Sequence, residues 1–195
     1  MFARVRFFKI TGYDAVTGAP TLDKTAIKLY TPGATEQEIN NRSISLELDS
    51  SSVSLEADNR KKTTETVKGA NITLTAYGVD ETALSALTGF EKGEDGLNMV
   101  VNTGEQKHFA MVFNGKQTNG TEYTCYLQDV TINTLLPNAQ QDGDSAEETS
   151  ISGYASALVV NGKATLGRLS YSGEADFLAQ STEPDSAKVA AVLAK

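Results

Sequence analysis

The sequence has few of the residues on which most enzyme and metal chemistry depends. Of its 195 residues, one is cysteine (Cys125), one is histidine (His108) and none is tryptophan. A single cysteine excludes an internal disulfide framework and cysteine-rich zinc sites. A single histidine excludes HExxH and multi-histidine metal sites and leaves a Ser-His-Asp triad only one base. We therefore expect no catalytic residue, no metal ion and no cofactor.

Basic residues and long apolar runs are also scarce. Seventeen Lys and Arg residues stand against 25 Asp and Glu residues, which gives a formal net charge of −8. Duplex binding depends on an excess of Lys and Arg, so specific DNA binding is not expected. No apolar run approaches the roughly 18 to 20 residues of a membrane span, and residues 1–10 lack the apolar run of a signal peptide. These features predict a protein made in the cytoplasm, without a membrane anchor.

Alternation of apolar and polar residues, with a period of two, is the main pattern in the chain. Ile44, Leu46 and Leu48 alternate with serine and glutamate, which predicts a strand with one apolar and one polar face. After residues 49–52 the apolar positions move by one, to 53, 55 and 57. The shift predicts either one long strand with a bulge or a tight hairpin across residues 49–52.

The remaining patterns predict further strands and two short helices. A helix over residues 80–88 ends at Gly89, and a second helix begins after residues 181–185. Residues 108–113 and 122–134 read as a hairpin whose return strand has another shift of parity near residues 128–130. We expect a mainly β, antiparallel sandwich or barrel-like domain over residues 1–195, with one short flanking α-helix and a short C-terminal α-helix.

Four local features allow more than one interpretation. Residues 142–148 alternate carboxylates as a calcium loop does, but Ala146 replaces a ligand, so we interpret the segment as a solvated acidic loop. The basic cluster at residues 60–62 suits either a solvated turn or a subunit interface. His108 and Cys125 lie within apolar strand patterns and are interpreted as packed residues. Phe7 and Phe8 are consecutive in a strand and face opposite ways, so both are buried in the fold or one contacts a partner.

Residues 42–160 contain a series of features in a distinctive order. It begins with an alternating strand that closes on Ala57-Asp58-Asn59, followed by the strand 71–75 and a short Leu-rich helix that ends at Gly89. An aromatic strand at residues 109–113, the turn Asn119-Gly120, an aromatic return strand and the polar segment 137–148 complete the series. This order resembles the major tail proteins of long-tailed bacteriophages. Residues 1–35 and the tail 178–195 fall outside the resemblance, and we expect them to act as assembly arms.

The resemblance implies a structural tail-tube subunit that forms stacked hexameric rings around a lumen. Double-stranded DNA passes through such a lumen without specific binding, and the partners are other copies and other tail proteins of the virion tail. An acidic lumen would avoid binding the phosphates that slide through it. The predicted lumen residues are Glu47, Asp49 and Glu56. The predicted contacts between subunits or rings are Phe7, Phe8, Arg60, Lys61, Lys62, Asp142, Asp144 and Glu147.

Three other functions are compatible with this sequence. A secretion-type tube subunit would show the same strands and the same polar face. A monomeric β-sandwich binding module shares the short strands and frequent turns. A glycosidase with paired carboxylates needs neither histidine nor cysteine, but its sugar cleft normally presents aromatic residues, and this chain has no tryptophan.

Overall fold

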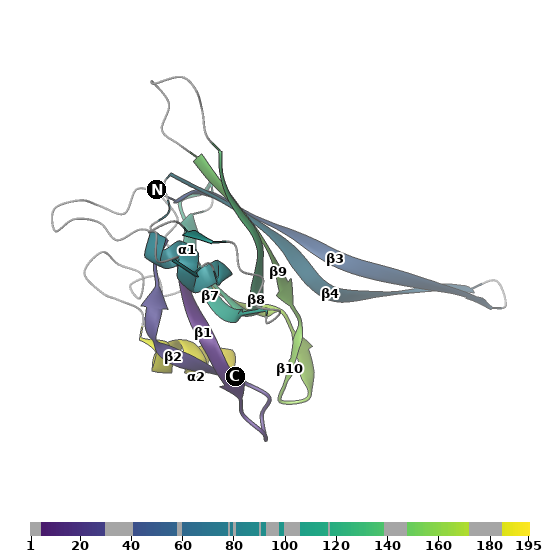
Figure 1. Ribbon diagram of the computed structural model, residues 1–195. Coiled ribbons are helices and arrows are strands. Elements are labelled where there is room, and N and C mark those ends of the chain that lie inside the picture. The colour runs from purple at the N-terminus through teal and green to yellow at the C-terminus, as the bar shows by residue number, and fades with distance from the viewer. Residues whose placement is uncertain are drawn as a thin grey trace.

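A computed structural model describes residues 5–29, 41–57, 60–77, 79, 81–89, 91–92, 98–99, 106–116, 118–138, 148–171 and 185–195. Its main element is an eight-stranded antiparallel sheet in the order β2-β1-β7-β8-β9-β4-β3, in which β12 also pairs with β8 (Figure 1). The strands of this sheet are β1 (Val5–Tyr13), β2 (Pro20–Ile27), β3 (Asn41–Ala57), β4 (Arg60–Tyr77), β7 (His108–Lys116), β8 (Glu122–Asn138), β9 (Glu148–Ser156) and β12 (Gly167–Ser170).

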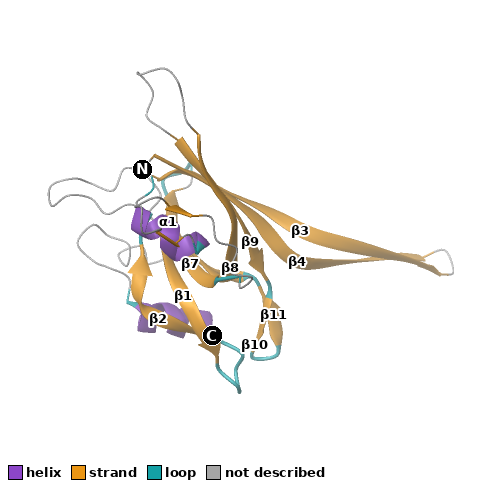
Figure 2. Ribbon diagram, in the orientation of Figure 1, coloured by secondary structure: helices purple, strands orange, loops and turns teal. Residues whose placement is uncertain are grey.

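Two short strand pairs and two helices complete the described part of the chain (Figure 2). The pairs are β5 (Glu91–Lys92) with β6 (Asn98–Met99), and β10 (Leu158–Val160) with β11 (Lys163–Thr165). The helices are α1 (Glu81–Thr88) and α2 (Ser186–Leu193). The structure confirms the predicted fold class, which is mainly antiparallel β with two short helices. Neither described helix is long and apolar enough to cross a membrane.

Apolar side chains are buried on both faces of the sheet. The larger core lies on the inner face and combines side chains of β1, β4, β7, β8 and β9 with Leu87 of α1. A smaller core lies on the outer face, where α2 places Val189 and Leu193 against Phe8 and Tyr126. Side chains of β3 and β7 line one groove, although these two strands are four places apart in the strand order. The sheet must therefore curve to bring them to the same groove.

A β-bulge lies at the level of each predicted shift of parity, in the partner strand for the first and in the strand itself for the second. Asp49 is opposite Gly69 while Ser50 is opposite Val67, so the extra residue, Lys68, lies in β4 and β3 continues as one long strand. One long strand is therefore the correct alternative to a hairpin across residues 49–52, but the bulge is in its partner β4, so the alternation of β3 itself continues unbroken through these residues. In β8 the extra residue lies between positions 127 and 130, since Phe109 is opposite Val130 and Met111 is opposite Leu127.

The hairpin of β3 and β4 extends far beyond the rest of the sheet (Figure 1). The inner part of β4 pairs with β3 on one side and with β9 on the other, and this second pairing ends at Gly69. Beyond that point residues 50–57 and 60–67 pair only with each other in the described part of the chain. We call these two segments the arm, and the remainder of the described structure the body.

The described parts of both terminal segments belong to the body. Residues 5–27 form β1 and β2, and β1 lies inside the sheet between β2 and β7. The second helix is capped by Asp185, whose side chain accepts a hydrogen bond from the backbone N–H of Ala187. Gln128, fully buried on β8, donates a hydrogen bond to the carbonyl of Leu193, 3.2 Å away, and so fixes the end of the helix.

Candidate functional site

One face of the three strands β3, β4 and β9 is polar over the four rows in which they pair side by side, from Ser43 to Asp49 of β3. Strand alternation places every second residue there, and the antiparallel register aligns these residues in rows across the three strands. Six of these twelve residues are exposed, five are partly buried and Gly69 is buried. The polar rows are Ser43 with Thr75 and Ser150, Ser45 with Thr73 and Ser152, Glu47 with Asn71 and Tyr154, and Asp49 with Gly69 and Ser156.

The opposite face of the same strands contributes to the inner core. Its rows are Ile44 with Leu74 and Ile151, Leu46 with Ile72 and Gly153, and Leu48 with Ala70 and Ala155. The buried members of β4 and β9 are at most 3% exposed. The three strands therefore form a wall with a polar side, as the alternation predicted, and an apolar side on which β4 and β9 are packed while Leu46 and Leu48 of β3 stay exposed.

The charged groups in the polar rows are all acidic. Glu47 is exposed and Asp49 is partly buried, and none of the side chains in these four rows is a lysine or an arginine. Hydroxyl, amide and carboxylate groups bind water well, while the carboxylates repel phosphate. Such a surface suits contact with a hydrated anionic polymer that must not bind.

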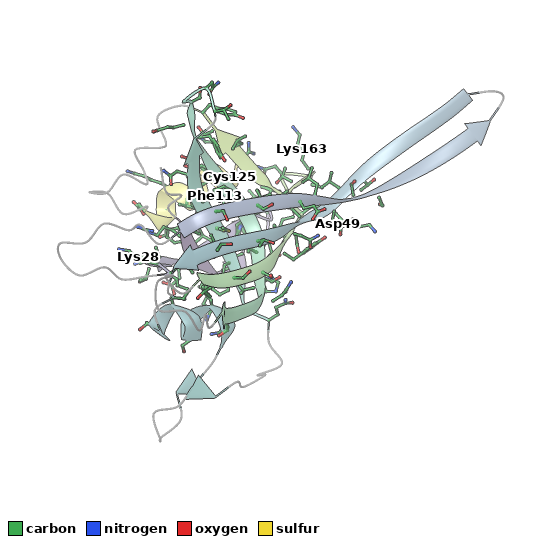
Figure 3. The ribbon with its side chains drawn as sticks, turned by 90° about the horizontal axis from the view of Figure 1, so that it is seen from above. Lys28, Asp49, Phe113, Cys125 and Lys163 are labelled. Atoms are coloured by element: carbon green, nitrogen blue, oxygen red, sulfur yellow. The ribbon has the colours of Figure 1, made fainter. Side chains whose placement is uncertain are left out.

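A tyrosine connects the three strands where the arm leaves the body. Tyr154 of β9 donates a hydrogen bond from its hydroxyl to Asp49 Oδ2 of β3, 2.9 Å away. Its ring reaches β3 by crossing over Gly69 of β4, where an added Cβ would lie 2.4 Å from the tyrosine hydroxyl and 2.4 Å from the carbonyl oxygen of Ala155. Gly69 is therefore required by the close approach of Tyr154 and β9. Figure 3 shows Asp49 at this junction.

The hydrogen bond to Asp49 raises the pKa of Tyr154 above its usual value of 10.0. A raised pKa in the folded state contributes stability below pH 10, and this contribution is lost as the pH rises through the folded-state pKa. We expect the urea midpoint of the native protein to fall more steeply above pH 10 than that of Tyr154→Phe. Asp49→Asn should behave like Tyr154→Phe, and identical slopes in all three proteins would contradict the assignment.

The other predicted site residues lie in different places. Phe7 is 1% exposed in the inner core and Phe8 is fully buried in the outer core. The two rings therefore pack within the chain, on opposite faces of β1, and neither is exposed for contact with a neighbouring subunit. The backbone of β4 places Arg60, Lys61 and Lys62 at the end of the arm, opposite Ala57, Glu56 and Leu55.

Some of the predicted positions are outside the described part of the structure. The side chains of Glu56 and of the basic cluster 60–62 are among them. Asp142, Asp144 and Glu147 also lie outside the described residues. Their roles as lumen or contact residues stay predictions.

A histidine–aspartate pair was not predicted from the sequence. His108 begins β7, and its Nδ1 lies 2.6 Å from Asp129 Oδ1. The Asp129 side chain is 7% exposed and the His108 side chain is 43% exposed, so the histidine shields a buried carboxylate. One sequence feature could have indicated a buried polar contact here. The polar residues Gln128 and Asp129 interrupt an otherwise apolar strand at the shift of parity. Among the described residues, no three His, Cys, Asp or Glu side chains are grouped so as to hold a metal ion.

Cys125 lies in the wall of an apolar groove on the inner side of the sheet, which Ile44, Phe113 and Leu169 also line. Burial raises the pKa of its thiol to about 12, from an ordinary value of 9.0. At pH 8 the thiolate is therefore about a thousandfold scarcer than in the unfolded chain. We expect its reaction with a disulfide reagent to slow by about that factor relative to the protein in urea, with Cys125→Ala as the blank. Equal rates in the folded and unfolded protein would contradict this.

Comparison with known proteins assigns no family. No protein-family model matches the sequence, and no curated protein matches it. The fold is similar to that of a chain in the extended sheath-tube complex of PVC, an extracellular contractile injection system, with 14% identity and a TM-score of 0.44. That match covers 67% of this chain and 80% of the other.

Two further solved structures are similar at the same distant level. A chain of the anti-feeding prophage (AFP) baseplate is 10% identical, with a TM-score of 0.44, and the match covers 87% of this chain and 92% of that one. Hcp1 from Salmonella typhimurium is 16% identical, with a TM-score of 0.37, and the match covers 85% of this chain and 92% of Hcp1. With TM-scores below 0.5, none of the three likenesses identifies this protein.

Proposed function

We propose that this chain is the structural subunit of a tube, and that its polar wall of β3, β4 and β9 faces the lumen. The observation that carries the proposal is the wall itself, which is apolar on one side and polar and acidic on the other. A globular domain with no lumen gains nothing from excluding basic residues from the rows of one exposed sheet face. A conduit for a polyanion does, because each exposed lysine would add a phosphate contact.

The particular tube that we propose is the tail tube of a long-tailed bacteriophage, made of stacked hexameric rings. The order of motifs over residues 42–160 supports this choice. Six subunits of −8 each give a ring a formal charge of −48, which opposes binding of the genome during its passage. Glu47 and Asp49 contribute to this charge from the proposed lumen face, and Glu56 is the third predicted contributor.

Free sheet edges support assembly. In the described part of the chain, β3 is the last strand of the sheet on one side and β2 is the last on the other. Exposed edges are normally blunted or covered, since their unpaired N–H and C=O groups pair readily with other chains. Contacts between identical subunits would cover these edges by closed symmetry.

Negative-stain microscopy of the purified protein over a range of concentrations, with light scattering in parallel, tests the proposal. We expect rings or hollow tubes of uniform diameter. A strictly monodisperse monomer at high concentration, also in the presence of preformed tail initiator complexes, would favour a monomeric binding module. Nuclease-protected DNA in tubes fixed during ejection distinguishes a genome conduit from a secretion-type tube, which would use the same ring and the same lumen wall.

A further inference from the structure

Two neighbouring rows of side chains on the outer face of the sheet combine apolar core residues with polar ones. They cross the strands β1, β7, β8 and β12, none of which belongs to the polar wall. We call them the outer rows, and they are Arg6, Val112, Tyr126 and Arg168 in the first row and Asn114, Thr124 and Ser170 in the second. Val112 and Tyr126 pack in the outer core, so alternation places all seven side chains on the face that carries α2.

The polar members of the outer rows are withdrawn from water. Thr124 is fully buried, Arg6 is 5% exposed and Asn114 is 9% exposed, while Arg168 and Ser170 are partly buried. Burying a polar group costs free energy unless a hydrogen bond replaces its contact with water. Arg6 meets this requirement in part, because its Nη1 donates a hydrogen bond to the carbonyl of Val5, 3.0 Å away.

Two buried polar atoms of the outer rows have no hydrogen-bond partner. They are the hydroxyl oxygen of Thr124 and the Nε atom of Arg168. In the part of the chain that the structure describes, no other side-chain nitrogen or oxygen is both buried and without a partner. Buried polar atoms in native proteins are almost always satisfied, so an unpaired one indicates a bound water, an ion or a functional role.

The two unpaired groups are neighbours. Arg168 is opposite Tyr126 and Ser170 is opposite Thr124, so Arg168 and Thr124 are diagonal partners across β12 and β8. Diagonal positions are roughly 7 to 8 Å apart, which a long side chain can span. The guanidinium can only donate hydrogen bonds, and a threonine hydroxyl can donate one as well. A single group with two acceptor atoms would therefore satisfy both.

The local charge favours an anion over a water molecule as that acceptor. The only charged residues in the outer rows are Arg6 and Arg168, although the chain as a whole has a formal net charge of −8. No carboxylate of the described residues forms an ion pair with Arg168. Because a guanidinium stays charged in proteins, a water molecule would satisfy its N–H group and leave its charge uncompensated. An oxyanion would do both.

We propose that Arg168 and Thr124 bind a small oxyanion on the outer face of the sheet. The guanidinium donates two parallel hydrogen bonds to two oxygens of the anion, which is the geometry in which arginine binds phosphate and carboxylate groups. The hydroxyl of Thr124 donates a third. Since the polar wall contributes no residue to this site, the inference does not depend on the proposed tube function.

Equilibrium dialysis of the purified protein with labelled phosphate, sulfate and acetate, each at the same ionic strength, tests the site directly. We expect at least one of the three anions to bind saturably, with one anion per chain. Arg168→Gln and Thr124→Val should each weaken this binding at least about tenfold, and circular dichroism checks that both variants are folded. Comparison of acetate with the two tetrahedral anions distinguishes a carboxylate ligand from a phosphate-like one.

Lys163→Gln is the matched control for the loss of charge. Lys163 is exposed on β11 and lies outside the outer rows, so its replacement removes one positive charge and should leave the affinity unchanged. Absence of saturable binding for all three anions would overturn the proposal. An equal loss of affinity in Lys163→Gln and Arg168→Gln would also overturn it, because the binding would then depend on net charge alone.

Urea unfolding provides a second measurement that a purely structural role of Thr124 would not produce. Without a binding anion, Thr124→Val should be at least as stable as the native protein, because it replaces an unpaired buried hydroxyl with a methyl group of similar shape. With the anion, the urea midpoint of the native protein should rise above that of Thr124→Val, since the ligand binds the folded state. An equal rise in both proteins would be the general effect of such salts on protein stability and would contradict the site.

Discussion

A cysteine in the polar wall of the assembled protein is expected to react about tenfold or more faster with a cationic thiosulfonate than with an anionic one. The variant is Ser45→Cys in the Cys125→Ala background, which leaves Glu47 and Asp49 in place. Ser45 is exposed in the row next to that of Glu47. In a ring, carboxylates of several subunits would surround the lumen, and an enclosed surface of one sign concentrates ions of the opposite sign.

Salt and charge removal provide the controls for this measurement. The ratio of the two rates, normalised to those of free cysteine, should approach one at high ionic strength, since the Debye length falls to about 3 Å at 1 M salt. It should also fall in Glu47→Gln. Ala191→Cys, exposed on α2 over the outer face, should show a smaller ratio. A ratio at or below one in assembled Ser45→Cys would place the wall outside an acidic lumen.

Replacing Phe109 with alanine is expected to lower the free energy of unfolding by about 3 to 5 kcal/mol. Phe109 is fully buried in the inner core, where its ring meets that of Phe7 edge-to-face, with 6.2 Å between centroids. The substitution removes the apolar contacts of a whole ring between β1 and β7 and leaves a cavity. Since small domains are stable by about 5 to 15 kcal/mol, this loss would bring the subunit near the threshold of unfolding.

Urea unfolding followed by tyrosine fluorescence and circular dichroism measures this change, because the chain has no tryptophan. Val159→Ala is the control, since Val159 is 62% exposed and its truncation should change the stability by no more than about 0.5 kcal/mol. A loss below about 1.5 kcal/mol for Phe109→Ala, with an unchanged urea dependence, would show that the core closes around the smaller side chain.

The features that the sequence predicted correctly depend on short-range patterns. The alternation of Ile44, Leu46 and Leu48 with polar residues is sufficient to predict both the strand and its polar face. The helix that ends at Gly89 has its signal in the same few residues, and Gly89 has the expected positive φ of 79°. The parity shift in β8 was also visible, because a bulge changes the order of apolar residues along its own strand. The shift in β3 has no such cause, since the bulge at that level lies in β4.

The features that were not predicted join residues that are distant in the sequence. Tyr154 and Asp49 are 105 residues apart, and only the register of three strands shows that they meet. The pairing of His108 with Asp129 depends on how one bulge turns a side chain, which no alternation pattern specifies. The apolar groove likewise combines Ile44, Phe113 and Leu169, which are contributed by three separate strands.

The position of β1 inside the sheet affects when a subunit can finish folding. Phe8 of β1 pairs with Ala110 of β7, so the first strand to be synthesised receives this partner about 100 residues later. At ordinary ribosome speeds of about 5 to 20 residues per second, the delay is about 5 to 20 s. The arm, in which residues 50–57 and 60–67 pair only with each other in the described part of the chain, can form during that interval. Each nascent chain would therefore present its arm before its own body is complete, and premature association is a hazard that translation rate and chaperones would control.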